Sequence, residues 1–594
     1  MAVRRWIRTG ALAGLVTVFL ALVGLIGGFA DVFLIGDEVT FAGVMLLLPA
    51  FAAGVVAAAP RIEGGERREK TLGEAAAAAA ITAAAAGIVF AAAVLLANLI
   101  GEERIRPVFL NVSPTLMEFV AFGQSTVVGA LILVALSTVA GVLGGLLRAA
   151  PPVIRRSVTA AVTVTVLFGF LQRVIPIALD QLSLERDWLY SSIHHGLTWV
   201  GAAVVAAVSA GVSLLNARFG GRVRGSLASS MGRDRSGPAM SPVRLISSVA
   251  AVALLIAAPL LLGSVISEVL GTVMVFALLG IGLNIVVGYA GLLDLGYVFF
   301  FALGAYSLAL LTGATLNAYG ISPDPAISGD LNFYVAIPIV MVIAAAAGLL
   351  IGAPVLRLRG DYLALVTLGL GEMVTVLVGS PWLVPLVGGP SGMRGITDAA
   401  IGGFAFRDPQ RFYYLALAFV ALAAFLSWRL ATSRIGRAWT AMREDEQTAD
   451  AMGISTTRFK LLAFAIGGAI GSLGGALFAV KIGSLTPASF QVIVSIQVLG
   501  LVILGGLGSI PGVLVGALVL VGLPGLLREF EEYRFLAYGA AVVAVMVLRP
   551  QGLVPNVRRS RELQDEERAQ DEWAKAVEEG ETPGELGPAA EVTT

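Results

Sequence analysis

The sequence predicts an all-α, polytopic integral membrane protein, and three observations lead to this fold class. Of the 594 residues, 57% are hydrophobic and only 13% are charged, whereas soluble domains carry about 25% charged residues. The mean hydropathy is +0.88. Apolar runs such as 10–29 and 245–262 have the roughly 20 residues that a helix needs to cross about 30 Å of hydrocarbon, and they lack the alternation of a transmembrane barrel strand.

About sixteen spans are predicted, with a margin of two. The N-terminal six lie near residues 10–29, 41–59, 75–99, 119–147, 157–179 and 196–215. The next ten lie near residues 245–262, 267–288, 297–312, 333–355, 362–379, 412–429, 460–480, 494–507, 510–527 and 535–548. The motif GGLGSIPG interrupts 494–527, so this pair is alternatively one broken or re-entrant element.

Composition divides the chain into four regions. Residues 1–215 form an N-terminal helical membrane region that carries no recognisable signature. Residues 216–244 hold six arginines among Gly, Ser and Pro, which is typical of a flexible connection. The principal membrane domain is 245–555. The tail, 556–594, is rich in charge and is expected to be solvated and disordered.

Basic residues predict the orientation of the spans. Arg4, Arg5 and Arg8 precede the first span, and further basic clusters follow the second, fourth and sixth spans. Lys and Arg favour cytoplasmic loops, so the linker, the motif RLRGD (357–361) and both termini are predicted to be cytoplasmic.

Several kinds of chemistry are excluded by the residues present. The chain has no cysteine and no Walker A, HExxH, GxSxG or dinucleotide-binding motif, so the protein is not predicted to be an enzyme. The adjacent His194 and His195 are interpreted as loop residues, and no metal site is predicted. The net charge of +0 gives no reason to expect nucleic-acid binding. No cofactor is expected on this chain, and any ATP used in transport is hydrolysed by another subunit.

A polar insert, SRIGRAWTAMREDEQTADAMGISTTRFK (433–460), interrupts the apolar pattern. Placed on a helix, its apolar residues gather on one side and its charges on the others; the apolar residues are Ala438, Ala441, Met442, Ala449 and Met452. Gly453 is a natural helix stop. The hypothesis is a short cytoplasmic amphipathic helix that receives force from a soluble motor; the alternative is an ordinary solvated loop.

One ionisable residue lies deep in an apolar span. Glu372 is about ten residues inside 362–379, where an unpaired charge costs several kcal/mol. The hypothesis is that Glu372 faces the bundle interior and lines or gates a path; the alternative is a buried structural hydrogen bond. Asp361 is interpreted as a helix cap or anchor beside Arg357 and Arg359.

Six motifs resemble those of LivM-type branched-chain amino acid permeases, in the same order over about 245–555. They are GLNIVVGYAGLLDLGYVFFFALGAYSLALL, LRLRGDYLALVTLGLGEM, GGPSGMRGI, SRIGRAWTAMREDEQTADAMGI, VILGGLGSIPGVLVGA and LRPQGL. The stretch EQTADAMGI also resembles the EAA loop of ABC-importer permeases, with Glu446, Ala449 and Gly453 at the motif positions. Residues 1–244 are not covered by the resemblance.

The resemblance implies a permease subunit of an ATP-driven importer for branched-chain amino acids in the bacterial plasma membrane. Its partners would be a LivH-like second permease, two cytoplasmic ATPases and an extracytoplasmic binding protein. The expected ATPase-coupling residues are Arg443, Glu444, Asp445, Glu446, Ala449, Met452, Gly453 and Ile454. The expected substrate-path residues are Asn284, Tyr289, Asp361, Tyr362 and Glu372.

Two alternatives remain open from the sequence. The same machinery importing urea or short amides would have the same motifs. An ion- or proton-coupled secondary transporter would instead show paired acidic residues at mid-membrane and an inverted repeat, whereas Glu372 is nearly solitary.

Overall fold

The computed structural model describes most of the chain and divides it into two compact units, Met1–Ala251 and Val252–Thr594. The described residues are 2–63, 66–68, 71–109, 111–172, 174–181, 185–191, 196–230, 242–313, 315–316, 331–355, 361–401, 404–526, 539, 542–543, 549 and 551–554. The predicted span 535–548, the tail 556–594 and the pair His194 and His195 lie almost entirely outside this set.

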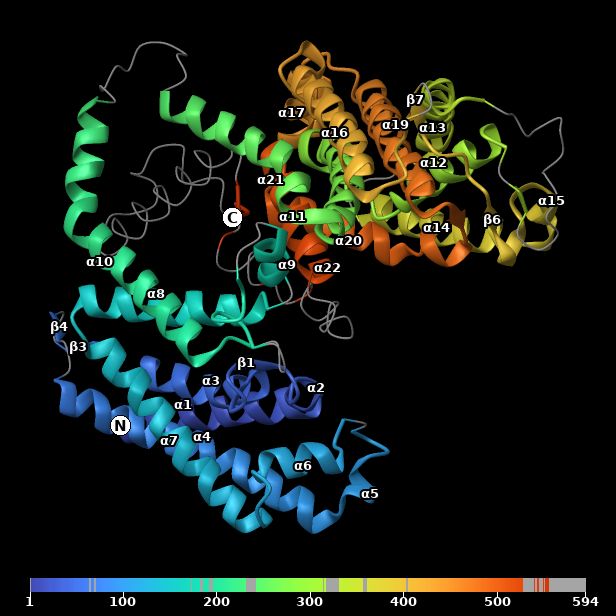
Figure 1. Ribbon diagram of the computed structural model, residues 1–594. Coiled ribbons are helices and arrows are strands. Elements are labelled where there is room, and N and C mark those ends of the chain that lie inside the picture. Colours follow the sequence, from blue (N-terminus) through green and yellow to red (C-terminus); the bar gives the residue numbers. More distant parts are fainter. Residues whose placement is uncertain are drawn as a thin grey trace. The chain divides into compact units, whose positions relative to one another are not determined.

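Four helices form the core of the N-terminal unit and lie side by side (Figure 1). They are α1 (Ala2–Leu22), α3 (Phe41–Ala57), α4 (Leu72–Ile100) and α7 (Thr126–Ala149). Glycines let their backbones approach closely: a Cβ at Gly54 would collide with the carbonyl of Gly141, and one at Gly10 with the carbonyl of Thr82. Small residues are the usual contact surface between membrane helices, and this explains the Ala-rich sequence of α4.

The remaining elements of this unit are a second helical pair and short connections. The pair is α8 (Pro152–Phe170) and α10 (Trp199–Ser230), which pack together. The connections are α2 (Leu25–Gly28), β1 (Phe33–Ile35), β2 (Val39–Thr40), β3 (Arg61–Glu63), β4 (Glu66–Arg68), α5 (Glu102–Ile105), α6 (Pro114–Val120) and α9 (Val174–Gln181). The strands form two antiparallel pairs, β1–β2 and β3–β4.

Two predicted span boundaries in this unit are wrong, and one predicted connection is partly helical. The span predicted at 119–147 begins at Thr126, because Phe122 and Gly123 have positive φ and separate α6 from α7. The span predicted at 157–179 ends at Phe170, and α9 follows it. Helix α10 extends to Ser230 and so covers the first part of the predicted linker.

The second unit contains a bundle of helices and a three-stranded antiparallel sheet. Its helices are α11 (Pro242–Leu283, which begins in the first unit), the π-helix η1 (Asn284–Tyr289), α12 (Val298–Leu311), α13 (Phe333–Val355), α14 (Asp361–Val378), α15 (Val384–Val387), α16 (Pro409–Ala431), α17 (Arg434–Glu444), α18 (Glu446–Ala451), α19 (Thr456–Ile482), α20 (Val492–Gly505), α21 (Ile510–Ala517), the π-helix η5 (Leu518–Gly522) and α22 (Leu523–Leu526). Short 3₁₀ turns are η2 (Pro381–Leu383), η3 (Gly389–Ser391) and η4 (Pro487–Phe490). The sheet order is β5 (Thr315–Leu316), β6 (Met393–Arg394), β9 (Ser484–Leu485), and β7 (Ala400–Ile401) pairs with β8 (Phe404–Ala405).

Helix α19 is the centre of this unit. It packs along both α12 and α13 (Figure 1), and 17 of its 27 residues are buried. Glycines on α19 accept close neighbours, as at Gly475, where a Cβ would collide with the carbonyl of Phe301. The middle of α19 is therefore tightly packed, and a displacement at either end of the helix acts against these contacts.

Helix α11 is broken where the sequence predicts two separate spans. Gly263 has φ +74° and ψ −175°, outside the helical region, and Pro259 has no N–H to donate to the carbonyl of Leu255. Side chains of α16 satisfy the freed carbonyls: Tyr413 Oη donates to Leu255 O at 2.8 Å, and Gln410 Nε2 donates to Pro259 O at 3.1 Å. Such compensation by a neighbouring helix is what makes a break tolerable in lipid.

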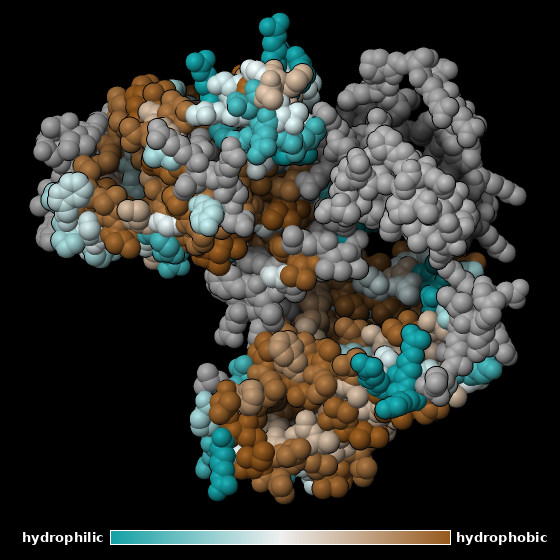
Figure 2. Space-filling view, turned by 180° about the vertical axis from the view of Figure 1, so that it is seen from behind, coloured by the Kyte–Doolittle hydropathy of each residue, from teal (hydrophilic) through white to brown (hydrophobic). Residues whose placement is uncertain are grey.

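The described helices fit a membrane protein with many spans. Nine of them are long and apolar enough to cross a bilayer, or ten when the bent pair 362–378 and 381–387 counts as one span. Four shorter apolar helices coincide with predicted spans: Phe41–Ala57, Trp199–Leu215, Val298–Leu311 and Ile510–Leu526. Figure 2 shows hydrophobic residues over much of the surface of each unit. The predicted fold class, a polytopic helical bundle, is confirmed.

Candidate functional site

Helix α17, which opens the polar insert, is fixed at its N-terminus by a cap and near its middle by a buried tryptophan. Ser433 is its N-cap and accepts hydrogen bonds from the backbone N–H groups of Ile435 and Gly436. Trp439 is completely buried, and its Nε1 donates to the carbonyl of Phe459 at 2.8 Å. A buried indole that also finds its hydrogen-bond partner is a strong anchor. Helix α17 is therefore packed onto the start of α19 and is not a loose loop.

The insert forms two helices, not the single helix predicted. Asp445 has an extended backbone (φ −152°, ψ 113°), ends α17 and caps α18, where its Oδ1 accepts from Thr448 N at 2.8 Å. This hydrogen bond to the carboxylate lowers the pKa of Asp445. The predicted single helix divides at Asp445 because aspartate is a preferred N-cap.

Helix α18 ends in a Schellman motif. Gly453 has φ +86°, its N–H donates to Asp450 O at 2.9 Å, and Ile454 N donates to Ala449 O at 3.0 Å, the pairing that defines this motif. Ala449 is buried as predicted, but Met452 is 80% exposed and does not share the apolar side. The break at Asp445 rotates Met452 outward, so it stands at the exposed tip of the insert.

A buried lysine ties α18 to α19. Lys460 Nζ lies 2.6 Å from Glu446 Oε1, with side chains 7% and 34% exposed, respectively. Because a buried charge is costly without its partner, this pair fixes α18 against α19. The other acidic residues of the insert, Glu444, Asp445 and Asp450, are exposed.

Arg443, the last basic residue of α17, reaches the π-helix η1. Its Nη1 donates to the carbonyl of Gly288 at 2.7 Å. Its side chain lies against Gly291 (φ +73°), in space that a Cβ at this position would fill. On the same π-helix, Asn284 is fully buried, and its Oδ1 accepts from Gly508 N at 2.8 Å. The insert is thus connected through η1 to the turn between α20 and α21. Single-turn π segments are frequent at functional sites.

The structure does not gather the five predicted path residues in one cavity. Tyr289, at the end of η1, is half-buried, and its hydroxyl accepts from Ser427 Oγ of α16 at 3.5 Å. Tyr362 and Glu372 lie on α14, where Tyr362 is exposed. The backbone of Asp361 begins α14, and its side chain lies outside the described residues.

On this chain Glu372 does not face the interior of the helix bundle. Glu372 is exposed together with Met373 and Val376, whereas Gly371 and Val374 form the buried side of α14. The predicted role of Glu372 in lining or gating a path stays a prediction. The sequence shows how far Glu372 lies from the ends of the span. It does not show which side of the helix Glu372 is on, because both sides of α14 are apolar.

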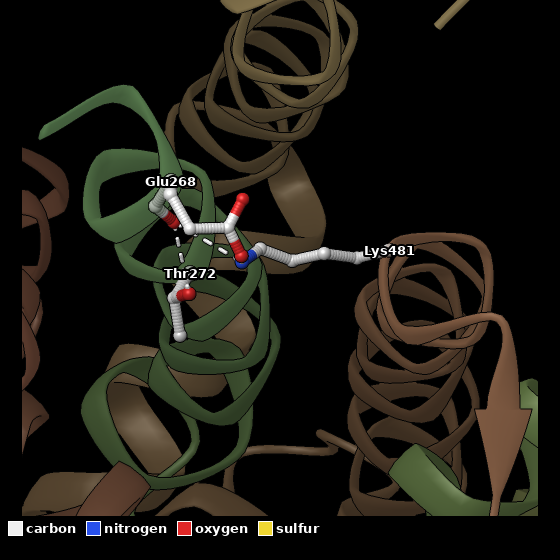
Figure 3. Close-up of polar contacts among 3 residues, drawn as sticks. All are labelled: Glu268, Thr272 and Lys481. Carbon is white, nitrogen blue, oxygen red and sulfur yellow. Dashed lines mark hydrogen bonds and ion pairs between the residues drawn. The ribbon is translucent and has the colours of Figure 1, made fainter. Parts of the chain in front are cut away.

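A second lysine ties the other end of α19 (Figure 3). Lys481 Nζ lies 2.5 Å from Glu268 Oε1 and also donates to the Glu268 carbonyl at 3.1 Å; its side chain is 7% exposed. That carbonyl also accepts from Thr272 Oγ1 at 3.2 Å. Lys460 and Lys481 were not among the residues predicted from the sequence. The rarity of lysine could have pointed to them, because the chain has four lysines and two of them occur in this one apolar helix.

These features define a class of protein: a polytopic helical membrane protein with a charged, exposed helical pair between two of its long helices. Within the described residues, no group of three His, Asp or Glu side chains is arranged to hold a metal ion.

The chain belongs to the family described as the branched-chain amino acid transport system permease component, whose model matches residues 265–548. It is 39% identical over 340 residues to the high-affinity branched-chain amino acid transport system permease protein LivM of Escherichia coli K12, covering 53% of this chain and 76% of that protein. It is 40% identical over 313 residues to LivM of Salmonella typhimurium, covering 49% and 70%. LivH of Escherichia coli K12 is 32% identical over 140 residues, covering 23% and 44%.

No solved structure matches the chain significantly. The family membership confirms the resemblance found in the sequence, and it confirms that the chain is a transport permease subunit and not an enzyme.

Proposed function

We propose that this permease imports branched-chain amino acids as part of an ATP-driven importer, with α17 and α18 as the element that an ATPase moves. The relatives are named for branched-chain amino acid transport, and both LivM and LivH match, which supports a LivH-like second permease as partner. Two cytoplasmic ATPases and an extracytoplasmic binding protein complete the assembly. The observation that carries the coupling role is the Arg443–Gly288 hydrogen bond.

The geometry of the insert supports the transmission of a movement from its exposed tip to the π-helix η1. The exposed tip at Met452 and the exposed acidic side chains of Glu444 and Asp450 offer a contact surface. On the opposite side, Trp439 and Lys460 hold the insert against α19. A push on the tip therefore moves α17 and α18 as one body. Arg443 carries the movement to η1, where Asn284 passes it to the turn at Gly508.

A cysteine placed at Met452 tests the contact and the orientation together. The chain has no cysteine of its own, so Met452→Cys carries one unique thiol at a fully accessible site. We expect this variant to form a cross-link with the ATPase in the assembled transporter and to react with a membrane-impermeant maleimide only in inside-out vesicles. Ile401→Cys, exposed in β7, is the matched control and should react only from the outside. Labelling of Met452→Cys from the outside would refute the coupling role.

We place the substrate path along the exposed side of α14, at its contact with the second permease. An ionisable side chain at this depth in lipid is unfavourable unless it is paired or faces water, and Glu372 is exposed on this chain alone. A partner subunit that covers α14 would enclose Glu372 beside a polar path. Tyr362 and Met373 are exposed on the same side of the helix.

Replacement of Glu372 tests this path. Glu372→Gln keeps the size of the side chain and removes its charge, so we expect slower uptake at normal expression and normal assembly with the second permease. Met373→Leu, at the adjacent exposed position, should leave uptake unchanged. Uptake by Glu372→Gln equal to that of the unmodified protein would remove Glu372 from the path.

A further inference from the structure

An open apolar groove runs along the surface between α13 and α16, with α19 as its floor. Its main section has a volume of about 840 Å³. The walls of this section carry Met341 and Ala345 from α13 and Leu426 and Leu430 from α16. The floor carries Leu462, Ala465, Ile466, Ala469 and Ile470.

The groove continues along the helices past the main section. Met341, Leu426 and Ile470 also line a second section of about 270 Å³, and Tyr334 and Phe419 join that section to a third of about 360 Å³. On α16 the lining extends from position 414 to position 430, about 24 Å at 1.5 Å per residue. This is most of the roughly 30 Å of a hydrocarbon core, so the groove follows the direction of lipid chains.

The end of the groove nearest α17 is basic. Arg429 lines it together with the hydroxyl-bearing Thr432 and Ser433. Arg429 is exposed, and its guanidinium has no hydrogen bond or ion pair with any residue that the structure describes. Trp428 beside it is 53% exposed, and tryptophan and arginine together mark the boundary between hydrocarbon and headgroups.

We propose that the main section binds an acyl chain of an anionic phospholipid from the leaflet on the α17 side, with the phosphate at Arg429. Basic pockets between membrane helices bind anionic headgroups, and the apolar lining accepts the chain. A protein helix fits this groove less well: membrane helices meet through small residues, whereas the walls here carry Met341, Leu426 and Leu430 and only one alanine, Ala345. The lipid would contact Ser433, the N-cap of α17, and so stabilise the start of the coupling element.

The test is lipid retention by the full-length protein in its assembled transporter. The complex is purified in mild detergent, supplied with equal amounts of phosphatidylglycerol and phosphatidylcholine, and analysed by native mass spectrometry. We expect phosphatidylglycerol to be retained preferentially, and Arg429→Gln to reduce that preference about fivefold, the contribution of one basic residue at a membrane surface. Arg437→Gln, an exposed position on α17 that does not line the groove, should keep the preference of the unmodified protein.

Two further measurements keep the result unambiguous. Ala469→Trp fills the floor and should reduce retention of both lipids; size-exclusion behaviour and melting temperature identify any variant that fails to fold. A photoactivatable residue at position 426 should label phospholipid. Equal retention of the two lipids by the unmodified protein, equal effects of Arg429→Gln and Arg437→Gln, or labelling of a protein partner from position 426 would each overturn the proposal. None of these readouts depends on ATP or on uptake, so the proposed coupling and this site fail independently.

Discussion

Replacing Arg443 by glutamine tests the connection between the insert and the broken helix. The side chain donates to the carbonyl of Gly288 at 2.7 Å in a half-buried position. Hydrogen bonds from charged groups contribute about 1.5–3 kcal/mol, and partial exposure favours the lower value. A loss of about 1.5 kcal/mol corresponds to roughly a tenfold change in an equilibrium. We therefore expect uptake per ATP hydrolysed to fall about tenfold in Arg443→Gln.

The assay compares uptake and ATP hydrolysis in the same proteoliposomes. Arg443→Gln should insert in the membrane, assemble and hydrolyse ATP at close to the normal rate, because the side chain is directed at η1 and not at the exposed tip. Arg437→Gln removes an exposed charge from the same helix and should leave the ratio of uptake to hydrolysis unchanged. Equal ratios in the two variants would refute the connection. A parallel loss of uptake and hydrolysis would show that Arg443 acts in assembly and not in coupling.

Three further predictions follow from contacts of the second unit. Tyr413→Phe removes the hydroxyl that satisfies a carbonyl beside the proline break of α11, so the melting temperature in detergent should fall by an amount equivalent to about 1–3 kcal/mol; no change would mean that water replaces the hydroxyl. Glu446→Gln leaves the buried Lys460 without its counter-charge and should destabilise the protein by about 1–3 kcal/mol, less than a fully buried pair because the carboxylate is one-third exposed; adding Lys460→Met should recover part of this loss, and no recovery would contradict the pairing. The hydrogen bond from Thr448 lowers the pKa of Asp445, so its contribution to α18 is complete above the ordinary carboxyl pKa of about 4 and is lost as pH falls through the lowered value. The protection factors of the α18 amides, which are exchange rates corrected for their intrinsic pH dependence, should therefore fall on acidification in the unmodified protein and not in Asp445→Ala, and an equal fall in both would contradict this cap.

Much of the fold could be predicted because lipid imposes a simple requirement. A helix that crosses hydrocarbon needs a long apolar run, and such runs are visible without any knowledge of their neighbours. The break in α11 was also legible, since Pro259 and Gly263 both disfavour a continuous helix. The polar insert was found by its charge density. The family could be predicted from six motifs whose order and residues resemble those of known permeases, and the family match confirmed it.

The sequence by itself determined the class of protein, the placement of most spans and the position of the insert. Only the tertiary structure decided which side of each span meets protein, and so it alone showed Glu372 on the exposed side of α14 and Met452 at the tip of α18. It also paired Arg443 with a carbonyl 155 positions away and Lys481 with a glutamate 213 positions away. The physical reason is that the lipid-facing and protein-facing sides of a membrane helix are almost equally apolar. Hydropathy therefore shows where a residue lies along a span but not which side of the helix it occupies. Every residue has a backbone carbonyl, so the sequence cannot show which carbonyl accepts a given side-chain hydrogen bond.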